Sequence, residues 1–211
     1  MSSTPIDNFQ DMRNETDLRQ KVLQASLALI EEGGLGRLSM REVARRSGVS
    51  HQAPYYYFGD REAILAAIAG NGFSMLAESF QRAVARAGSE PAKALEAIGL
   101  AYVGFALRHP AYFQAMFRAD AVPLDRYADV RKREDEAFGK LVEKIGEAFT
   151  DQPPTVRLRI SVACWAMVHG LATLILEGTL ARTVEIPRAR QRQMADEVIE
   201  TFTSLIIKDQ T

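Results

Sequence analysis

Three consecutive tyrosines, Tyr55, Tyr56 and Tyr57, follow Pro54 and precede Phe58. A buried phenol needs a hydrogen-bond partner, so a hydrophobic core does not favour three of them in a row. On a helix the three side chains point about 100° apart and cannot share one face. We predict that one or two hydroxyls reach a large polar partner such as a row of phosphates, while Phe58 packs beneath. For any single tyrosine, an ordinary core position with a satisfied hydroxyl is the alternative.

The residues just before the tyrosines are small and polar. Ser50, His51, Gln52 and Ala53 could meet base edges, since glutamine can bind adenine through two hydrogen bonds and alanine can contact a thymine methyl group. This pattern predicts that the segment reads DNA sequence in a groove.

Positive charge gathers in the same stretch. Residues 37–58 contain four arginines and one glutamate, a local charge of +3 in a chain whose formal net charge is −1. Phosphate contacts supply affinity and fix register without reading sequence. We expect Ser39 and Arg41, at the start of one helix, and Arg61, at the start of another, to contact phosphates, helped by nearby backbone amides. An ordinary solvated arginine is the alternative for Arg61.

Two short helices around a glycine turn must position these residues. Ser39 and Glu42 form a predicted capping box for a helix that stops at Ser47 and Gly48. Ser50 then caps a second short helix, from about 51 to 57. A preceding helix, capped by Thr16 after a flexible tail over 1–15, braces the pair. Such an arrangement is a helix-turn-helix, whose second helix enters the major groove of DNA.

The rest of the chain reads as long helices with short joints. Asp60 caps one helix, and prolines near positions 91, 110, 123, 153 and 187 mark later boundaries, because proline lacks a backbone donor and restrains the preceding residue. No stretch has the pattern of a strand. The sequence therefore predicts an all-α protein of about nine helices.

The stretch from Ser39 to Leu65 resembles the TetR/AcrR family of bacterial transcriptional regulators. Val49 and Ser50 match the family's turn, Tyr55 and Phe58 match its aromatic pair, and Arg61 stands where the family usually has lysine. The resemblance covers about residues 17–70. It implies a dimeric regulator with an N-terminal DNA-binding domain and C-terminal helices for dimerisation and ligand sensing.

One position departs from the family pattern. Pro54 stands where an aliphatic residue is more common. With Ser50 as the cap, Pro54 is the fourth helical residue and removes the first hydrogen bond within the helix, which should tilt its start.

Apolar residues near the C-terminus favour a homodimer. The helix expected over about 154–180 is apolar on more than one face and must be enclosed, and the last helix carries a stripe of its own. The residues assigned to a dimer interface are Ile160, Met167, Leu171, Val198, Phe202 and Leu205. A wholly internal bundle is the alternative.

The segment from Trp165 to Gly170 resembles the Trp-x-x-x-His-Gly signature of a TetR/AcrR subgroup with a WHG-type C-terminal domain, and residues 109–117 resemble another stretch of it. His169 could be a polar anchor for an effector, or a core histidine with a satisfied hydrogen bond. The predicted ligand-binding residues are Tyr102, Phe105, Phe113, Met116, Phe117, Trp165 and His169.

Catalytic and metal motifs are not found in the sequence. None of the three histidines follows a glutamate by three positions, which a di-iron bundle needs, and the single cysteine, Cys164, excludes cysteine-based zinc sites. The sequence has no P-loop and no Gly-x-Ser-x-Gly elbow. We expect no enzyme activity, no cofactor and no metal.

Composition limits location and partners. The single cysteine suggests a reducing compartment, the polar N-terminus is not a signal peptide, and the apolar run 160–176 is a little short for a bilayer. We expect a cytoplasmic protein without membrane contact. The balanced charge argues against an architectural DNA-coating protein.

The sequence thus predicts a DNA-binding domain over 16–65 and an effector-binding and dimerisation domain over 66–211. The expected function is a repressor, released from a palindromic double-stranded operator by a small, mostly apolar ligand.

Overall fold

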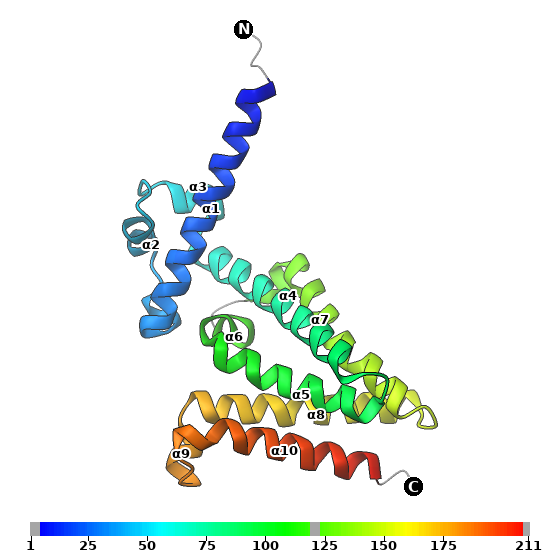
Figure 1. The fold of residues 1–211 in the computed structure, drawn as a ribbon. Coiled ribbons are helices and arrows are strands. Elements are labelled where there is room, and N and C mark those ends of the chain that lie inside the picture. Colours follow the sequence, from blue (N-terminus) through cyan, green and yellow to red (C-terminus); the bar gives the residue numbers. More distant parts are fainter. Residues whose placement is uncertain (1–4, 119–122, 209–211) are drawn as a thin grey trace. The chain divides into compact units, whose positions relative to one another are not determined.

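The computed structural model describes residues 5–118 and 123–208, with only the backbone described for 5–15 and 124. These residues form ten α-helices and two 3₁₀-helices, η1 and η2, and no strand is found among them (Figure 1). The all-α prediction is confirmed, with one helix more than expected. The elements are α1 Pro5–Gly33, η1 Leu35–Arg37, α2 Met40–Ser47, α3 Ala53–Phe58, α4 Arg61–Ala87, α5 Pro91–Arg108, α6 Pro110–Phe117, η2 Leu124–Arg126, α7 Ala128–Ala148, α8 Pro154–Leu176, α9 Thr179–Thr183 and α10 Arg188–Lys208.

The chain divides into two compact units. The first contains residues up to 71 together with 111–130, and the second contains 72–110 and 131 onwards. Helix α4 begins in the first unit and continues into the second. The division at residue 65, which the sequence suggested on functional grounds, stays a prediction.

Proline marks the helix starts as expected. Pro91, Pro110 and Pro154 are the first residues of α5, α6 and α8, and Pro187 directly precedes α10. The first helical position suits proline because its missing N–H has no partner within the helix anyway. The joints inferred from proline are therefore confirmed at these four places.

The start of α1 differs from the prediction. The helix begins at Pro5 and runs without a break through Thr16 to Gly33, so Thr16 is not a cap and residues 5–15 are helical. The flexibility expected of the segment 1–15 stays a prediction. Proline again suits a first helical position. Residues 1–4 lie outside the described part of the chain.

In the first unit, α1, η1, α2 and the first turns of α4 enclose an apolar core. α1 packs against η1, α2 and α3. The buried apolar residues include Val22, Leu29, Ile30, Leu35, Leu38, Val43, Ala44, Ile64 and Leu65. Within each helix these residues recur at helical spacing and so lie on one face. The core that they form holds the two short helices in place.

In the second unit, α5 packs against both α8 and α10. Val103 and Phe105 of α5, Ile145 of α7 and Ile199 of α10 are fully buried. Gly99 allows a close approach, because a methyl group there would lie 2.9 Å from Cγ2 of Ile199. This tight contact fixes α10 along α5.

Helices α4 and α8 are each long and apolar enough, by length and composition alone, to cross a membrane. The most apolar window of α4 is 56% buried within the chain, as in the core helix of a folded domain, whereas that of α8 is only 17% buried. The expectation of a run too short for a bilayer is corrected, since α8 has 23 residues. Helix α8 therefore has few fully buried residues in the single chain.

Candidate nucleic-acid interface

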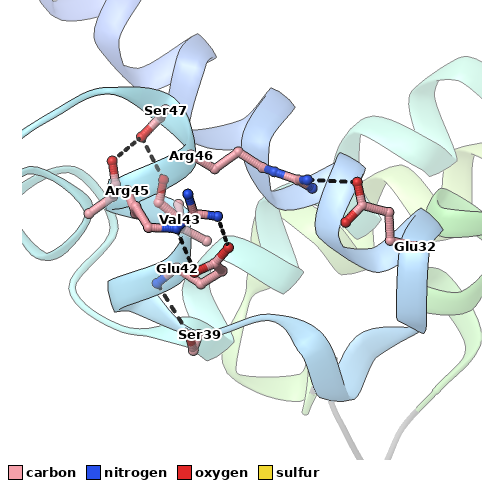
Figure 2. A network of polar contacts seen from close by, with 8 residues as sticks. Glu32, Ser39, Glu42, Val43, Arg45, Arg46 and Ser47 are labelled. Atoms are coloured by element: carbon pink, nitrogen blue, oxygen red, sulfur yellow. Dashed lines mark hydrogen bonds and ion pairs between the residues drawn. The ribbon is translucent and has the colours of Figure 1, made fainter.

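Helix α2 has the N-cap residue and the terminal glycine that the sequence predicted, and of the predicted capping box the structure shows the bond to Ser39. Ser39 is extended (φ −134°), and its hydroxyl oxygen accepts the backbone N–H of Glu42 at 3.3 Å. Gly48 ends the helix in the left-handed region at φ 68°, which glycine adopts without strain. The Glu42 carboxylate accepts hydrogen bonds from Arg45, as Figure 2 shows. Ser39 is exposed at the start of α2, where it was expected.

Helix α3 begins two residues later than predicted. Its first residue is Ala53, its N-cap is Gln52, and His51 lies in the preceding turn. Pro54 is therefore the second helical residue, and the first intrahelical bond, from the N–H of Tyr56 to the carbonyl of Gln52, is intact at 2.9 Å. The predicted loss of that bond at Pro54 is wrong, because proline in the first turn has no such bond to remove. Pro54 is instead buried.

The candidate base-reading residues lie at the open end of α3. Ser50, His51 and Gln52 are exposed, and Ala53 is half-buried. Because α3 starts at Ala53, the first three belong to the turn and the cap rather than to the helix body. Their contacts with bases stay a prediction.

The tyrosines differ in exposure, as their angular separation requires. Tyr55 is 52% exposed and Tyr56 is 74% exposed, whereas Tyr57 is half-buried with its ring 5.1 Å from that of Tyr56. Phe58 is half-buried, and the guanidinium of Arg19 lies 4.8 Å above its ring. Arg19 of α1 was not predicted, because nothing local connects it with a residue 39 positions further along the chain.

Two of the four arginines in the basic stretch are paired. Arg45 bonds Glu42, and Arg46 bonds Glu32 of α1 at 2.7 Å, which lowers the pKa of both carboxyls (Figure 2). Glu32 lies outside the stretch that the sequence counted, so the charge around α2 is smaller than +3. Arg41 is exposed and has no ion pair within the described residues.

Arg61, the first residue of α4, is half-buried and bonds main-chain oxygens. Its Nε donates to the carbonyl of Leu38 at 2.9 Å, and its Nη2 donates to the carbonyl of Leu35 at 2.7 Å. The predicted phosphate contact of Arg61 stays a prediction. Asp60 caps α4 as expected, accepting the N–H of Ala63 at 2.8 Å.

In the second unit, three predicted ligand-binding residues form one polar cluster. The Tyr102 hydroxyl lies 2.8 Å from Nδ1 of His169, and Nε1 of Trp165 donates to the same hydroxyl at 3.4 Å. Burial raises the pKa of Tyr102 well above its usual range and lowers that of His169. Phe138 of α7 also meets Trp165, with ring centroids 5.7 Å apart, a contact the sequence did not predict.

The other predicted ligand-binding residues are divided between the two units. Phe105 is buried in the second unit, with its ring 5.2 Å from that of His109. Phe113, Met116 and Phe117 belong to the first unit. That all seven line one pocket stays a prediction. Across the described residues, no group of three histidine, cysteine or acidic side chains could hold a metal ion.

The predicted interface residues are mostly half-buried. Ile160, Met167, Leu171, Val198, Phe202 and Leu205 were assigned to it, and of these Leu205 is exposed, at 63%. Helix α8 exposes three other large apolar side chains, Leu158, Val162 and Leu174. The interface role of the six predicted residues stays a prediction.

Family models match both parts of the chain. One, described as bacterial regulatory proteins of the tetR family, matches residues 22–68, and one described as a tetracyclin repressor-like C-terminal domain matches residues 95–202. The first match covers the capped helices and the glycine turn described above. The chain belongs to the TetR family. The WHG-type subgroup of TetR proteins is not among these matches and stays a prediction.

Individual proteins are similar over most of the chain. The transcriptional repressor KstR of Rhodococcus jostii is 30% identical over 147 residues, which are 67% of this chain and 64% of the relative, so the match spans somewhat less than two thirds of that protein. A solved protein of unknown function from Rhodococcus sp. RHA1 is 30% identical with a TM-score of 0.72, covering 87% of this chain and 94% of that one. The regulator FadR of Bacillus subtilis, solved with stearoyl-CoA, has a TM-score of 0.67 at 13% identity, covering 88% and 97%, and shows likeness of fold alone.

Proposed function

We propose that this TetR-family protein is a sequence-specific DNA-binding transcriptional regulator. The observation that carries the proposal is the pair α2 and α3, seated on a buried core and separated by the left-handed Gly48. Gln52 is exposed to solvent at the start of α3, and Tyr56 is exposed further along the same helix. A rigid scaffold with polar and aromatic side chains at an exposed helix start suits a DNA groove.

We propose that phosphates are contacted around this reader. Ser39 and Arg41 lie at the N-terminus of α2, where backbone amides favour an anion, and Arg41 is exposed. The phenol groups of Tyr55 and Tyr56 are open to solvent and can donate to a phosphate oxygen. These contacts would fix the register in which Gln52 meets a base.

The protein acts as a homodimer in this proposal. Helix α8 leaves Leu158, Val162 and Leu174 exposed, and α10 leaves Leu205 exposed on the same unit. Exposed apolar side chains on helices commonly form the core of a subunit interface. A two-fold dimer would also suit a palindromic operator with half-sites about 34–36 Å apart.

We propose repression relieved by a small, mostly apolar ligand. KstR is named a repressor, and FadR was solved with stearoyl-CoA. The polar cluster of Tyr102, Trp165 and His169 lies among apolar residues of the second unit and offers an anchor for such a ligand. Because α4 is continuous from the second unit into the first, a shift of α4 would carry the effect to the DNA reader.

The same proposal places the protein in the cytoplasm, without enzyme activity or a membrane contact. Its relatives by sequence are named transcriptional regulators. Burial raises the pKa of the Cys164 thiol to about 11, which leaves it protonated and unsuited to act as a nucleophile.

The decisive experiment is a selection of genomic fragments with purified protein, followed by binding of the enriched duplex at several salt concentrations. A regulator will enrich one palindromic sequence and bind it as a dimer. Weak, strongly salt-dependent binding without an enriched sequence would contradict the proposal.

The variant Gln52→Ala then tests base reading on the enriched duplex. It should cost about 1–3 kcal/mol and relax the preference at one base pair, because one side chain no longer reads that position. Gln81→Ala, at an exposed site on α4, is the matched control and should change neither quantity. An unchanged preference in Gln52→Ala would remove Gln52 from the readout.

A further inference from the structure

We propose that Arg61 is a positioning residue, which clamps the first turn of α4 to the segment that leads into α2, and not a phosphate ligand. The inference rests on the proposed DNA-binding function and revises the phosphate contact of Arg61 that the sequence predicted. The two hydrogen bonds to the carbonyls of Leu35 and Leu38 span 26 and 23 residues of sequence.

The position of Arg61 explains why its side chain turns to carbonyls. The N-terminus of α4 carries the positive end of the helix dipole, which disfavours a cation there. Asp60 occupies the capping site and already binds the amide of Ala63. Carbonyl oxygens carry a partial negative charge, which attracts the guanidinium. Hydrogen bonds from a charged donor to such oxygens are stronger than those between two neutral groups.

The clamp acts on the approach to α2. Leu35 and Leu38 are buried, and Leu38 is the residue directly before Ser39, the N-cap of α2. Holding both carbonyls therefore fixes where α2 begins relative to α4. Ser39 and Arg41, the proposed phosphate contacts, lie at that start, so their placement depends on Arg61.

The same geometry leaves the guanidinium poorly placed for phosphate. Arginine binds a phosphate best with two parallel N–H groups, and one such pair is Nε with Nη2. In Arg61 these are the two nitrogens that already bond the carbonyls. A phosphate held by that pair would have to displace both bonds.

The two roles separate in a comparison of Arg61→Ala, Arg61→Lys and Arg41→Ala on the palindromic duplex enriched by genomic selection. Lysine keeps the charge but is a point donor that cannot hold two carbonyls as a planar fork does. A clamp predicts that both Arg61 variants bind about tenfold or more weakly, and that Arg61→Lys binds no more tightly than Arg61→Ala although lysine keeps the charge. Arg41→Ala, the phosphate comparison, should lower the slope by about one. A slope lowered in Arg61→Ala and restored with affinity in Arg61→Lys would overturn the proposal.

Hydrogen exchange in the absence of DNA gives a second readout. Amides of residues 35–42 should exchange faster in both Arg61 variants than in wild type, and at the wild-type rate in Arg41→Ala. Unchanged exchange in Arg61→Ala would overturn the clamp. If the wild-type protein selects no DNA sequence, the proposed function fails, while the exchange measurement still decides the role of Arg61.

Discussion

The hydroxyl oxygen of Tyr102 on α5 lies 2.8 Å from Nδ1 of His169 on α8. The same oxygen accepts the indole N–H of Trp165 at 3.4 Å. Burial holds Tyr102 in its protonated form, so its own proton is available to Nδ1, and burial also favours the neutral imidazole. We therefore predict that Tyr102 donates to Nδ1 and that the ring proton of His169 lies on Nε2.

This tautomer is directly measurable. We expect the ¹⁵N signals of His169 at pH 7.5 to show an unprotonated Nδ1 and a protonated Nε2. Tyr102→Phe should remove that preference and cost about 1 kcal/mol of unfolding free energy, because it removes the hydroxyl that joins Trp165 to His169. The chain has only three histidines, so His51→Gln and His109→Gln variants complete the assignment. A protonated Nδ1 in the wild type would contradict the assignment.

Stability should fall in mild acid because of His169. Burial lowers the folded-state pKa of this imidazole below its usual value of 6.5. Below about pH 6.5 the unfolded chain therefore binds a proton that the folded chain takes up only at lower pH, and unfolding free energy decreases as the pH falls through that window. Urea titrations between pH 5 and 8 would measure this. His169→Gln should flatten the dependence, whereas His51→Gln, at an exposed site, should leave it as in wild type.

The proposed dimer depends on the open face of α8. Leu158→Glu and Val162→Glu should each yield monomers and abolish binding to a palindromic operator, because a buried, unpaired carboxylate in an interface costs several kcal/mol. Val184→Glu is the matched control, since Val184 is 57% exposed just beyond α9 and outside the proposed interface. Analytical ultracentrifugation measures the oligomeric state. A dimer that persists in both α8 variants would place the interface elsewhere.

Local chemistry explains which features the sequence could predict. Ser39 accepts the amide three residues later, Asp60 does the same for α4, and Gly48 adopts a left-handed turn; each depends on neighbours in sequence. The prolines that open α5, α6 and α8 act through the same short range. These signals were sufficient to order the helices and to place the helix-turn-helix.

Features that depend on distant partners were missed. The bonds of Arg61 to Leu35 and Leu38, and the ion pair of Arg46 with Glu32, exist only once α1, α2 and α4 are packed. The predicted start of α3, at about residue 51, was too early. It relied on Ser50 as a good capping residue, but His51 and Gln52 form a turn and the helix starts at Ala53. A preferred cap is a local preference, and packing selects the actual first residue.

Replacing three helical glycines by alanine should change stability in three different ways, because the added methyl group meets different surroundings at each. Gly139→Ala on α7 meets no atom within 4 Å and should stabilise the fold by up to about 1 kcal/mol, the difference in helix propensity. Gly99→Ala would place its methyl group 2.9 Å from Ile199 and 3.5 Å from Val168, inside a packed core, and should destabilise by about 1–3 kcal/mol.

Gly104→Ala lies between these two cases. Its methyl group would meet the guanidinium of Arg192 at 2.8 Å, and the end of an arginine side chain can move at small cost. Moving the Arg192 side chain weakens its bond to the carbonyl of Leu100, and this loss offsets the gain in helix propensity from alanine. We therefore expect a change in stability near zero. Thermal melts of the three variants test the order Gly139→Ala, Gly104→Ala, Gly99→Ala from most to least stable. A Gly99→Ala protein as stable as wild type would mean that α10 can shift along α5, and the close approach would then not fix their packing.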